Sequence, residues 1–152
     1  MFKRFCIPLL AAASLSASSL ALAQVTVTDP WIRATVPAQK TAGAFMQLKS
    51  SKPVRLVGIS SPVAGRAEIH QMEMQGQTMR MRAVDGIDVP ANKPVNLASG
   101  GYHVMLFDLR RQLKDGEQVP MTLSFVDAKH KRENLTVQVP VKPVAYAAPA
   151  GH

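Results

Sequence analysis

Cysteine is almost absent from this sequence: Cys6 is the only one among 152 residues. A single cysteine forms no internal disulfide and cannot build a cysteine-based zinc site. Charged residues are also sparse, at 18%, whereas hydrophobic residues make up 47%. This balance excludes wholesale disorder and indicates a globular chain of one domain, or at most two small ones.

Three further features are missing. After the first two dozen residues, no hydrophobic run is long enough to span a bilayer. No apolar pattern with a 3.6-residue period persists over three turns, so we expect no extended helix. No pair of carboxylates and no Ser/His/Asp constellation can be placed, which argues against an enzyme.

The N-terminal segment has the layout of a secretory signal peptide. Lys3 and Arg4 precede an apolar stretch that ends in a small-x-small cleavage site at residues 21–23. We expect cleavage after Ala23, which would export a soluble, cysteine-free chain to the bacterial periplasm. The alternative is an uncleaved membrane anchor, although serines interrupt the short apolar stretch. A lipid anchor on Cys6 is not expected, because this residue lies before that stretch.

The remaining chain reads as one β domain followed by a tail. The predicted organisation is a signal peptide over 1–23, a β domain over 24–141, and a flexible Pro/Ala-rich tail over 142–152. Short β-prone runs alternate with turn signals throughout the domain, which is typical of a sandwich or barrel. The candidate strands are Val25–Thr28, Trp31–Thr35, Ala44–Lys49, Val54–Ser60, Glu68–Met74, Thr78–Ala83, Tyr102–Leu109, Met121–Phe125 and Leu135–Val139.

A hairpin around Gln75-Gly76 carries the first candidate site residues. If Gln75 and Gly76 form the turn, His70 faces Met81; if the turn is Gly76-Gln77, Met72 faces Met81. The two registers differ by an even shift, so both place the same side chains on one face. That shared face carries His70, Met72, Met74, Met79 and Met81.

The second group of candidates lies in the run GGYHVMLFDL, residues 100–109. His103 and Met105 are two residues apart, so they share one face of a strand, while Val104 and Leu106 point into the expected core. Placed beside the hairpin, this strand would bring two imidazoles and several thioethers together. Neutral His and Met ligands form a soft donor set, which favours Cu(I) over zinc, magnesium or calcium.

A purely structural role is the competing interpretation for each of these side chains taken alone. Methionine is a common core filler. We therefore expect Met46, Met74, Met79 and Met121 to serve packing rather than metal binding. His70, Met81, His103 and Met105 stand apart because they form a joint arrangement, two on each side, with matching strand parity. The acidic residues Glu68, Glu73, Asp85 and Asp88 look like ordinary surface charges.

At these four positions the chain resembles the PCuAC-type periplasmic copper chaperones. The family pattern is His, ten residues, Met, twenty-one residues, His, one residue, Met, and the spacing from His70 through Met81 and His103 to Met105 matches it. The segment WIRATVPAQKTAGAFMQL, residues 31–48, also resembles the family, and the similarity extends over about Val25 to Val139.

The resemblance implies an all-β, cupredoxin-like Greek-key β-sandwich that binds Cu(I) through His70, Met81, His103 and Met105. It implies delivery of copper for assembly of the CuA centre of cytochrome c oxidase, to the copper-accepting subunit or to another periplasmic copper chaperone. Some members bind further copper, including Cu(II), in a His/Met-rich tail, but this tail contributes only His152. We expect a monomer.

Three other functions compete with this one. A blue-copper electron carrier requires a cysteine thiolate, which the exported chain would lack. A copper buffering or resistance protein would share the metal site but have no dedicated acceptor. A metal-free interaction module would use the methionines as core. Nucleic acid is an unexpected partner for an exported protein, despite the net charge of +8.

Overall fold

The computed structural model describes residues 25–149, and within this range every regular element is a β-strand. The predicted signal peptide over 1–23, Cys6 and His152 lie outside the described residues. The strands are β1 (Val25–Arg33), β2 (Ala42–Ser50), β3 (Val54–Ser60), β4 (Ala64–Gln75), β5 (Thr78–Val84), β6 (Ile87–Val89), β7 (Val95–Leu97), β8 (Tyr102–Leu109), β9 (Gln118–Asp127) and β10 (Arg132–Lys142). Residues 25–149 contain no helix with the length and hydrophobicity of a membrane span.

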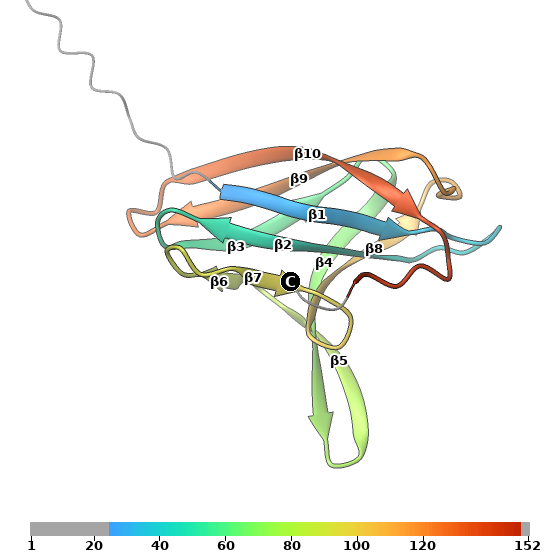
Figure 1. Ribbon diagram of the computed structural model, residues 1–152, viewed down its shortest axis with the longest axis horizontal. Coiled ribbons are helices and arrows are strands. Elements are labelled where there is room, and N and C mark those ends of the chain that lie inside the picture. The colour runs from blue at the N-terminus through green and yellow to red at the C-terminus, as the bar shows by residue number, and fades with distance from the viewer. Residues whose placement is uncertain (1–24, 150–152) are drawn as a thin grey trace, which may run out of the picture.

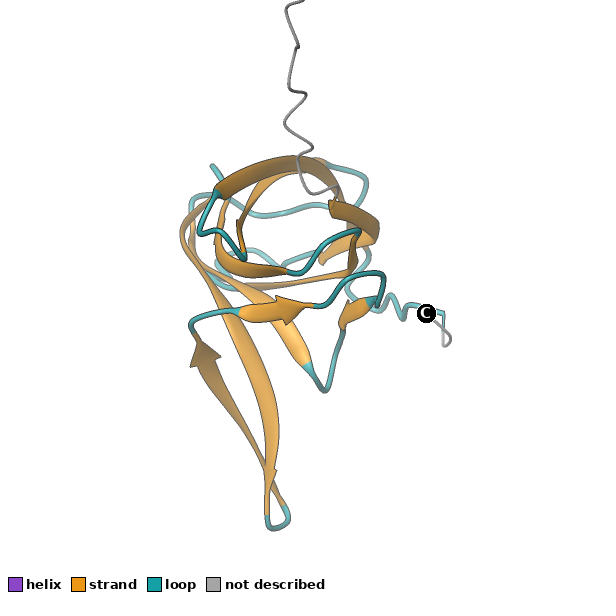
Figure 2. Cartoon of the chain, turned by 90° about the vertical axis from the view of Figure 1, so that its left-hand side faces the viewer, coloured by secondary structure: helices purple, strands orange, loops and turns teal. Residues whose placement is uncertain are grey.

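All ten strands belong to one hydrogen-bonded sheet in the order β5-β4-β8-β7-β2-β1-β10-β9-β3-β6. The sheet closes over itself into two layers, and the end-on view shows them curving around a common centre (Figure 2). The parallel pairing of β1 with β10, at Ile32 opposite Val141, links the two layers. The β4–β5 hairpin leaves this body and projects away from it (Figure 1).

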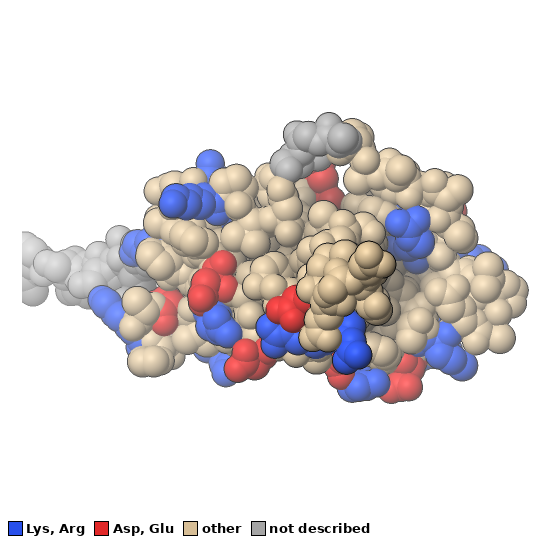
Figure 3. All heavy atoms as spheres, turned by 90° about the horizontal axis from the view of Figure 1, so that it is seen from below, with Lys and Arg blue, Asp and Glu red and all other residues tan. Residues whose placement is uncertain are grey.

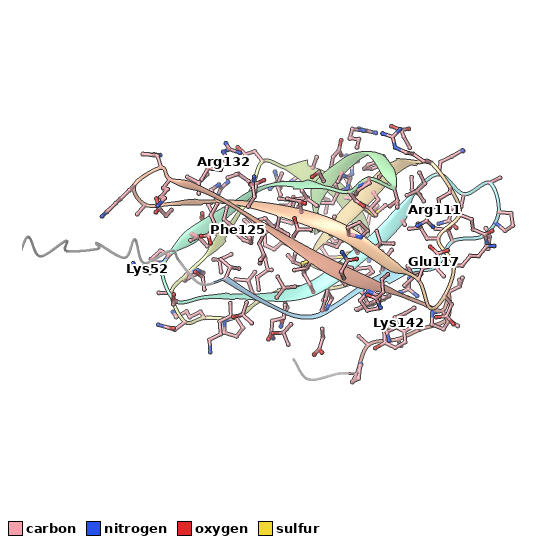
Figure 4. The ribbon with its side chains drawn as sticks, turned by 90° about the horizontal axis from the view of Figure 1, so that it is seen from above. Lys52, Arg111, Glu117, Phe125, Arg132 and Lys142 are labelled. Atoms are coloured by element: carbon pink, nitrogen blue, oxygen red, sulfur yellow. The ribbon has the colours of Figure 1, made fainter. Side chains whose placement is uncertain are left out.

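Alternation of apolar and polar residues explains the core, because successive side chains of a strand point to opposite faces. Leu123 and Phe125 of β9 are 0% and 1% exposed, whereas their neighbours Thr122 and Ser124 are only partly buried. Phe125 lies in the middle of the body, and the ion-paired Arg111 and Glu117 lie together at one end (Figure 4). Other fully buried core side chains are Ile32, Leu48, Leu56, Leu97, Leu106, Leu113, Met121, Val89, Val104 and Val119.

The all-β prediction is confirmed, and two details differ from it. The Asp29-Pro30 signal, predicted to separate two strands, is a bulge inside β1, with Asp29 at a positive φ of 48°. The short strands β6 and β7 were not predicted. Each has only three residues, too few for a local pattern, and each is held by pairing with a distant strand, β3 and β2 respectively.

Part of the predicted tail lies against the body. Lys142 is the last residue of β10, and the Tyr146 ring packs edge-on against Trp31, with ring centroids 4.9 Å apart. The Arg33 guanidinium donates hydrogen bonds to the carbonyl oxygens of Val144 and Tyr146, at 2.7 and 3.0 Å. Residues 143–146 therefore cover the outer face of β1.

Candidate metal centre

The pairing of β4 with β8 places His70 directly opposite His103. The two imidazole rings lie with their centroids 5.9 Å apart, on the outer face of this layer. The core side of the sheet fixes the orientation of both histidines, because their neighbours Ile69 of β4 and Val104 of β8 point into the core and are 4% and 0% exposed. Burying these apolar neighbours leaves the two histidines no other face to occupy.

The hairpin register brings Met81 to the same place. Met72 pairs with Met81 and Gln75 pairs with Thr78, so the turn is Gly76-Gln77, the second of the two predicted registers. Gly76 adopts a φ of +64°, which glycine reaches without steric cost. The Met81 side chain crosses β4, and its sulfur lies 3.2 Å from Nε2 of His103.

The hydrogen bonds of His70 leave one ring nitrogen free for a ligand. Nε2 of His70 donates to Oε2 of Glu68 at 2.7 Å, because a carboxylate can only accept. In that tautomer Nδ1 carries the lone pair, and this atom is buried without a hydrogen-bond partner. A buried imidazole nitrogen without a partner, on a ring oriented by a carboxylate, is a typical arrangement for a metal ligand.

His103 presents its opposite nitrogen. Its Nδ1 donates to the carbonyl oxygen of Gly101 at 3.3 Å, so the lone pair lies on Nε2, which faces the sulfur of Met81. Two ligands of one tetrahedral ion lie about 3.5 Å apart when metal–nitrogen and metal–sulfur bonds are about 2.0 and 2.3 Å. The observed separation is close to that distance, so the pair could bind one ion together.

Burial lowers the pKa of His103 below its usual value, and the nearby His70 lowers it further, against the opposing hydrogen bond to Gly101. The side chain is 5% exposed. Both facts favour the neutral imidazole, which is the form that binds metal.

Met105 lies one pair further along the same face, opposite Glu68 on β4 and Gly43 on β2. It is partly buried. Gly43 has a packing role here, because a Cβ at this position would come within 3.0 Å of the Phe45 ring. The structure thus brings Met81 into contact with His103, places His70 directly opposite His103, and places Met105 two residues further along β8.

Aromatic rings surround this group. Phe45 lies 6.3 Å from His103, and Phe107 lies 5.7 Å from His70, measured between ring centroids. Phe45 in turn packs on Trp31 at 4.5 Å. Met81, by contrast, is 52% exposed and remains open to solvent.

The predicted donor set consists of two imidazoles and two thioethers. Residues 25–149 contain no group of three or more His, Cys, Asp or Glu side chains that could hold a metal ion. Hard divalent cations prefer oxygen ligands, whereas thioethers select soft ions such as Cu(I). The site is therefore chemically matched to a soft monovalent ion.

Two aspects of this region were missed. Glu68 is not the ordinary surface charge that the sequence predicts, because it orients His70; its position two residues before His70 on one strand was the available signal. The hydrogen bond from His70 lowers the pKa of Glu68, and the nearby Arg66 adds to this effect. Among the four methionines expected to pack, Met46 and Met121 are buried, but Met74 and Met79 are 62% and 46% exposed.

Comparison with known proteins places this site in context. Residues 25–141 match the model of the family described as "Putative lipoprotein LpqE-like". A putative lipoprotein of Leifsonia xyli subsp. xyli is 29% identical over 119 residues, which cover 78% of this chain and 69% of the relative. The word lipoprotein is part of the description of those relatives. Cys6, the only cysteine of this chain that could carry a lipid, lies outside the described residues.

Solved structures show the same fold with copper bound. The copper-bound PCuAC domain from PmoF2 superposes with a TM-score of 0.62 at 26% identity, covering 78% of this chain and 92% of that domain. The Cu(I) form of DR1885 from Deinococcus radiodurans gives a TM-score of 0.57 at 31% identity, covering 87% and 85% of the two chains. The predicted cupredoxin-like β-sandwich is confirmed by these structures, and the chain belongs to the LpqE-like family, whose fold here is that of the PCuAC domains.

Proposed function

We propose that this protein is a periplasmic copper chaperone that binds one Cu(I) through His70, Met81, His103 and Met105. The proposal rests on two observations at paired strand positions: Nδ1 of His70 is buried without a hydrogen-bond partner, and Nε2 of the opposite His103 lies 3.2 Å from the Met81 sulfur. The copper-bound state of two solved relatives supports the choice of metal.

The ligand set suits an exported carrier. Thioethers bind Cu(I) without losing a proton, and they cannot be lost to disulfide formation in an oxidising compartment. Four neutral ligands leave a total charge of +1 with Cu(I), which costs less to hold in a partly buried site than a divalent ion. The cargo is therefore held without any charged ligand.

The exposures of the ligands indicate how copper would leave. His103 is 5% exposed, whereas Met81 is 52% exposed and lies on the projecting hairpin. An approaching acceptor would displace Met81 first, while the less exposed imidazoles still hold the ion. Thiolates are stronger ligands for Cu(I) than thioethers, so transfer to a thiolate-containing acceptor is downhill.

The acceptor we propose is the CuA centre of cytochrome c oxidase, reached directly or through another periplasmic copper chaperone. Periplasmic location rests on the signal peptide predicted over residues 1–23, with the β domain predicted over 24–141 exported as a monomer. A defect in oxidase assembly on deletion, restored by added copper, would support delivery. Normal oxidase with increased copper sensitivity would instead support buffering.

An anaerobic Cu(I) titration of the protein purified from the periplasm, against a competing chelator, tests the site. We expect tight binding that is lost when Met81→Ala and His103→Ala are combined. Met121→Leu is the matched control, because it removes a buried thioether of the opposite layer at nearly constant volume. Equal binding by the double variant and the wild type would refute the site, and no binding by either would leave a metal-free interaction module.

A further inference from the structure

The far half of the β4–β5 hairpin has no support from the body. β4 pairs with β8 as far as Gln71 opposite Tyr102, and the Met72 amide donates one further hydrogen bond to the Gly101 carbonyl oxygen at 3.1 Å; from residue 73 onward β4 pairs with β5 alone. All residues of β5 except Val84 are exposed. The end of the hairpin extends clear of both layers in two perpendicular views (Figures 1 and 2).

The two faces of this free segment differ in chemistry. One face is polar: the Arg82 guanidinium donates hydrogen bonds to Gln71 and Glu73, both at 3.1 Å. The other face consists of methionines in two directly opposed pairs, Met72 with Met81 and Met74 with Met79. The hairpin is thus amphipathic, and the outer pair of its apolar face, Met74 and Met79, is exposed, whereas Met81 reaches His103. Seen from below, the end of the hairpin is formed mostly by uncharged atoms (Figure 3).

Packing does not explain these methionines. Among residues 25–149, five large hydrophobic side chains are exposed, and three of them are Met74, Met79 and Met81. Strand formation does not explain them either, because exposed strand positions favour β-branched and aromatic residues. The property that the four residues share, and that Val or Leu would lack, is a thioether sulfur.

The spacing allows three of these sulfurs to meet around one ion. Opposed residues have Cβ atoms about 4.5–5.5 Å apart, and adjacent pairs on one face are separated by about 7 Å along the strand. Methionine has three rotatable bonds beyond its backbone, so its sulfur can move by several ångströms. With Met81 directed toward His103, the sulfurs of Met72, Met74 and Met79 remain available to one another.

We propose that Met72, Met74 and Met79 form a second binding site for a soft monovalent cation, Cu(I) or Ag(I), at the exposed end of the hairpin. Three thioethers in water, without an imidazole, bind more weakly than the inner site. Met72, a ligand of the outer site, lies directly opposite Met81, a ligand of the inner site. The two sites are therefore neighbours on the hairpin. The outer site would therefore collect or release the ion carried by the inner one. Only this exchange rests on the proposed function; the outer site itself does not.

The test follows the methionine methyl groups by NMR, with ¹³C-methyl methionine in the exported protein, during titration with Ag(I) and, anaerobically, with Cu(I). We expect two equivalents to bind to the wild type. The Met74 and Met79 methyl signals should shift mainly with the second equivalent. Met74→Leu/Met79→Leu should bind one equivalent only, because leucine keeps the apolar face but removes the sulfur.

Two further variants separate the outer site from the inner one. His70→Ala/His103→Ala should still shift the Met74 and Met79 signals, now with its first equivalent. Met121→Leu, the buried control, should bind two equivalents like the wild type. Binding of one equivalent by the wild type, with no change in Met74→Leu/Met79→Leu, would overturn the proposal and leave the hairpin as an apolar docking surface. Unchanged binding by His70→Ala/His103→Ala would contradict the inner site alone.

Discussion

Replacing Glu68 by Gln should weaken Cu(I) binding by about 10- to 100-fold, the usual effect of removing a group that orients a metal-binding histidine. The Glu68 carboxylate accepts the Nε2 proton of His70 at 2.7 Å and thereby leaves Nδ1 free for the metal. A glutamine amide can turn either end toward the ring. Its NH₂ would favour the opposite tautomer, with the proton on the nitrogen that should bind copper.

We expect Glu68→Gln to lower the affinity for copper and to leave the free energy of unfolding nearly unchanged. Glu68 also contacts Arg66 at 2.6 Å, but Arg66 is 53% exposed, and ion pairs at such surfaces contribute little to stability. The remaining hydrogen bond from His70 to a glutamine carbonyl would be neutral instead of charge-assisted, hence weaker. The urea midpoint should therefore stay close to that of the wild type.

Glu73→Gln is the matched control, because Glu73 lies on the same strand but bonds Arg82 on the opposite face. Competition with a Cu(I) chelator should show the affinity loss for Glu68→Gln alone. The ¹⁵N shifts of His70 in the metal-free protein should show a change of tautomer in the same variant. Equal affinities for the two variants, or an unchanged His70 spectrum, would refute the orienting role of Glu68.

Three further predictions concern the fold. Phe125→Ala should lower the free energy of unfolding by about 3–5 kcal/mol, because the ring is 1% exposed; Val36→Ala, at 54% exposed, should change it by less than about 0.5 kcal/mol. Similar urea midpoints for the two variants would contradict the described core. Tyr146→Ala should shift the fluorescence of Trp31, the only tryptophan, to longer wavelength, and an unchanged spectrum would show that the ring contact is absent in solution. Gly76→Val should destabilise the hairpin by about 1–2 kcal/mol, since its φ is +64°. Amide exchange between residues 72 and 81 would measure this effect, and unchanged rates would argue against the turn.

The sequence alone predicted the β class and the grouping of the site residues. Strand alternation has a period of two, so the shared face of His103 and Met105 could be assigned from their spacing. The same parity grouped His70 with Met81 in either hairpin register. The family resemblance then assigned these four residues to a copper site and predicted a cupredoxin-like fold.

Only the tertiary structure decided which of these side chains meet. The pairing of β4 with β8 joins segments more than thirty residues apart along the sequence, and no local pattern specifies such a partner. The hairpin register, the crossing of Met81 over β4 and the contact between Glu68 and His70 all depend on it. The exposure of Met74 and Met79 likewise could not be predicted from the sequence. Alternation tells which residues share a face, but whether that face is covered depends on what the rest of the chain packs against it.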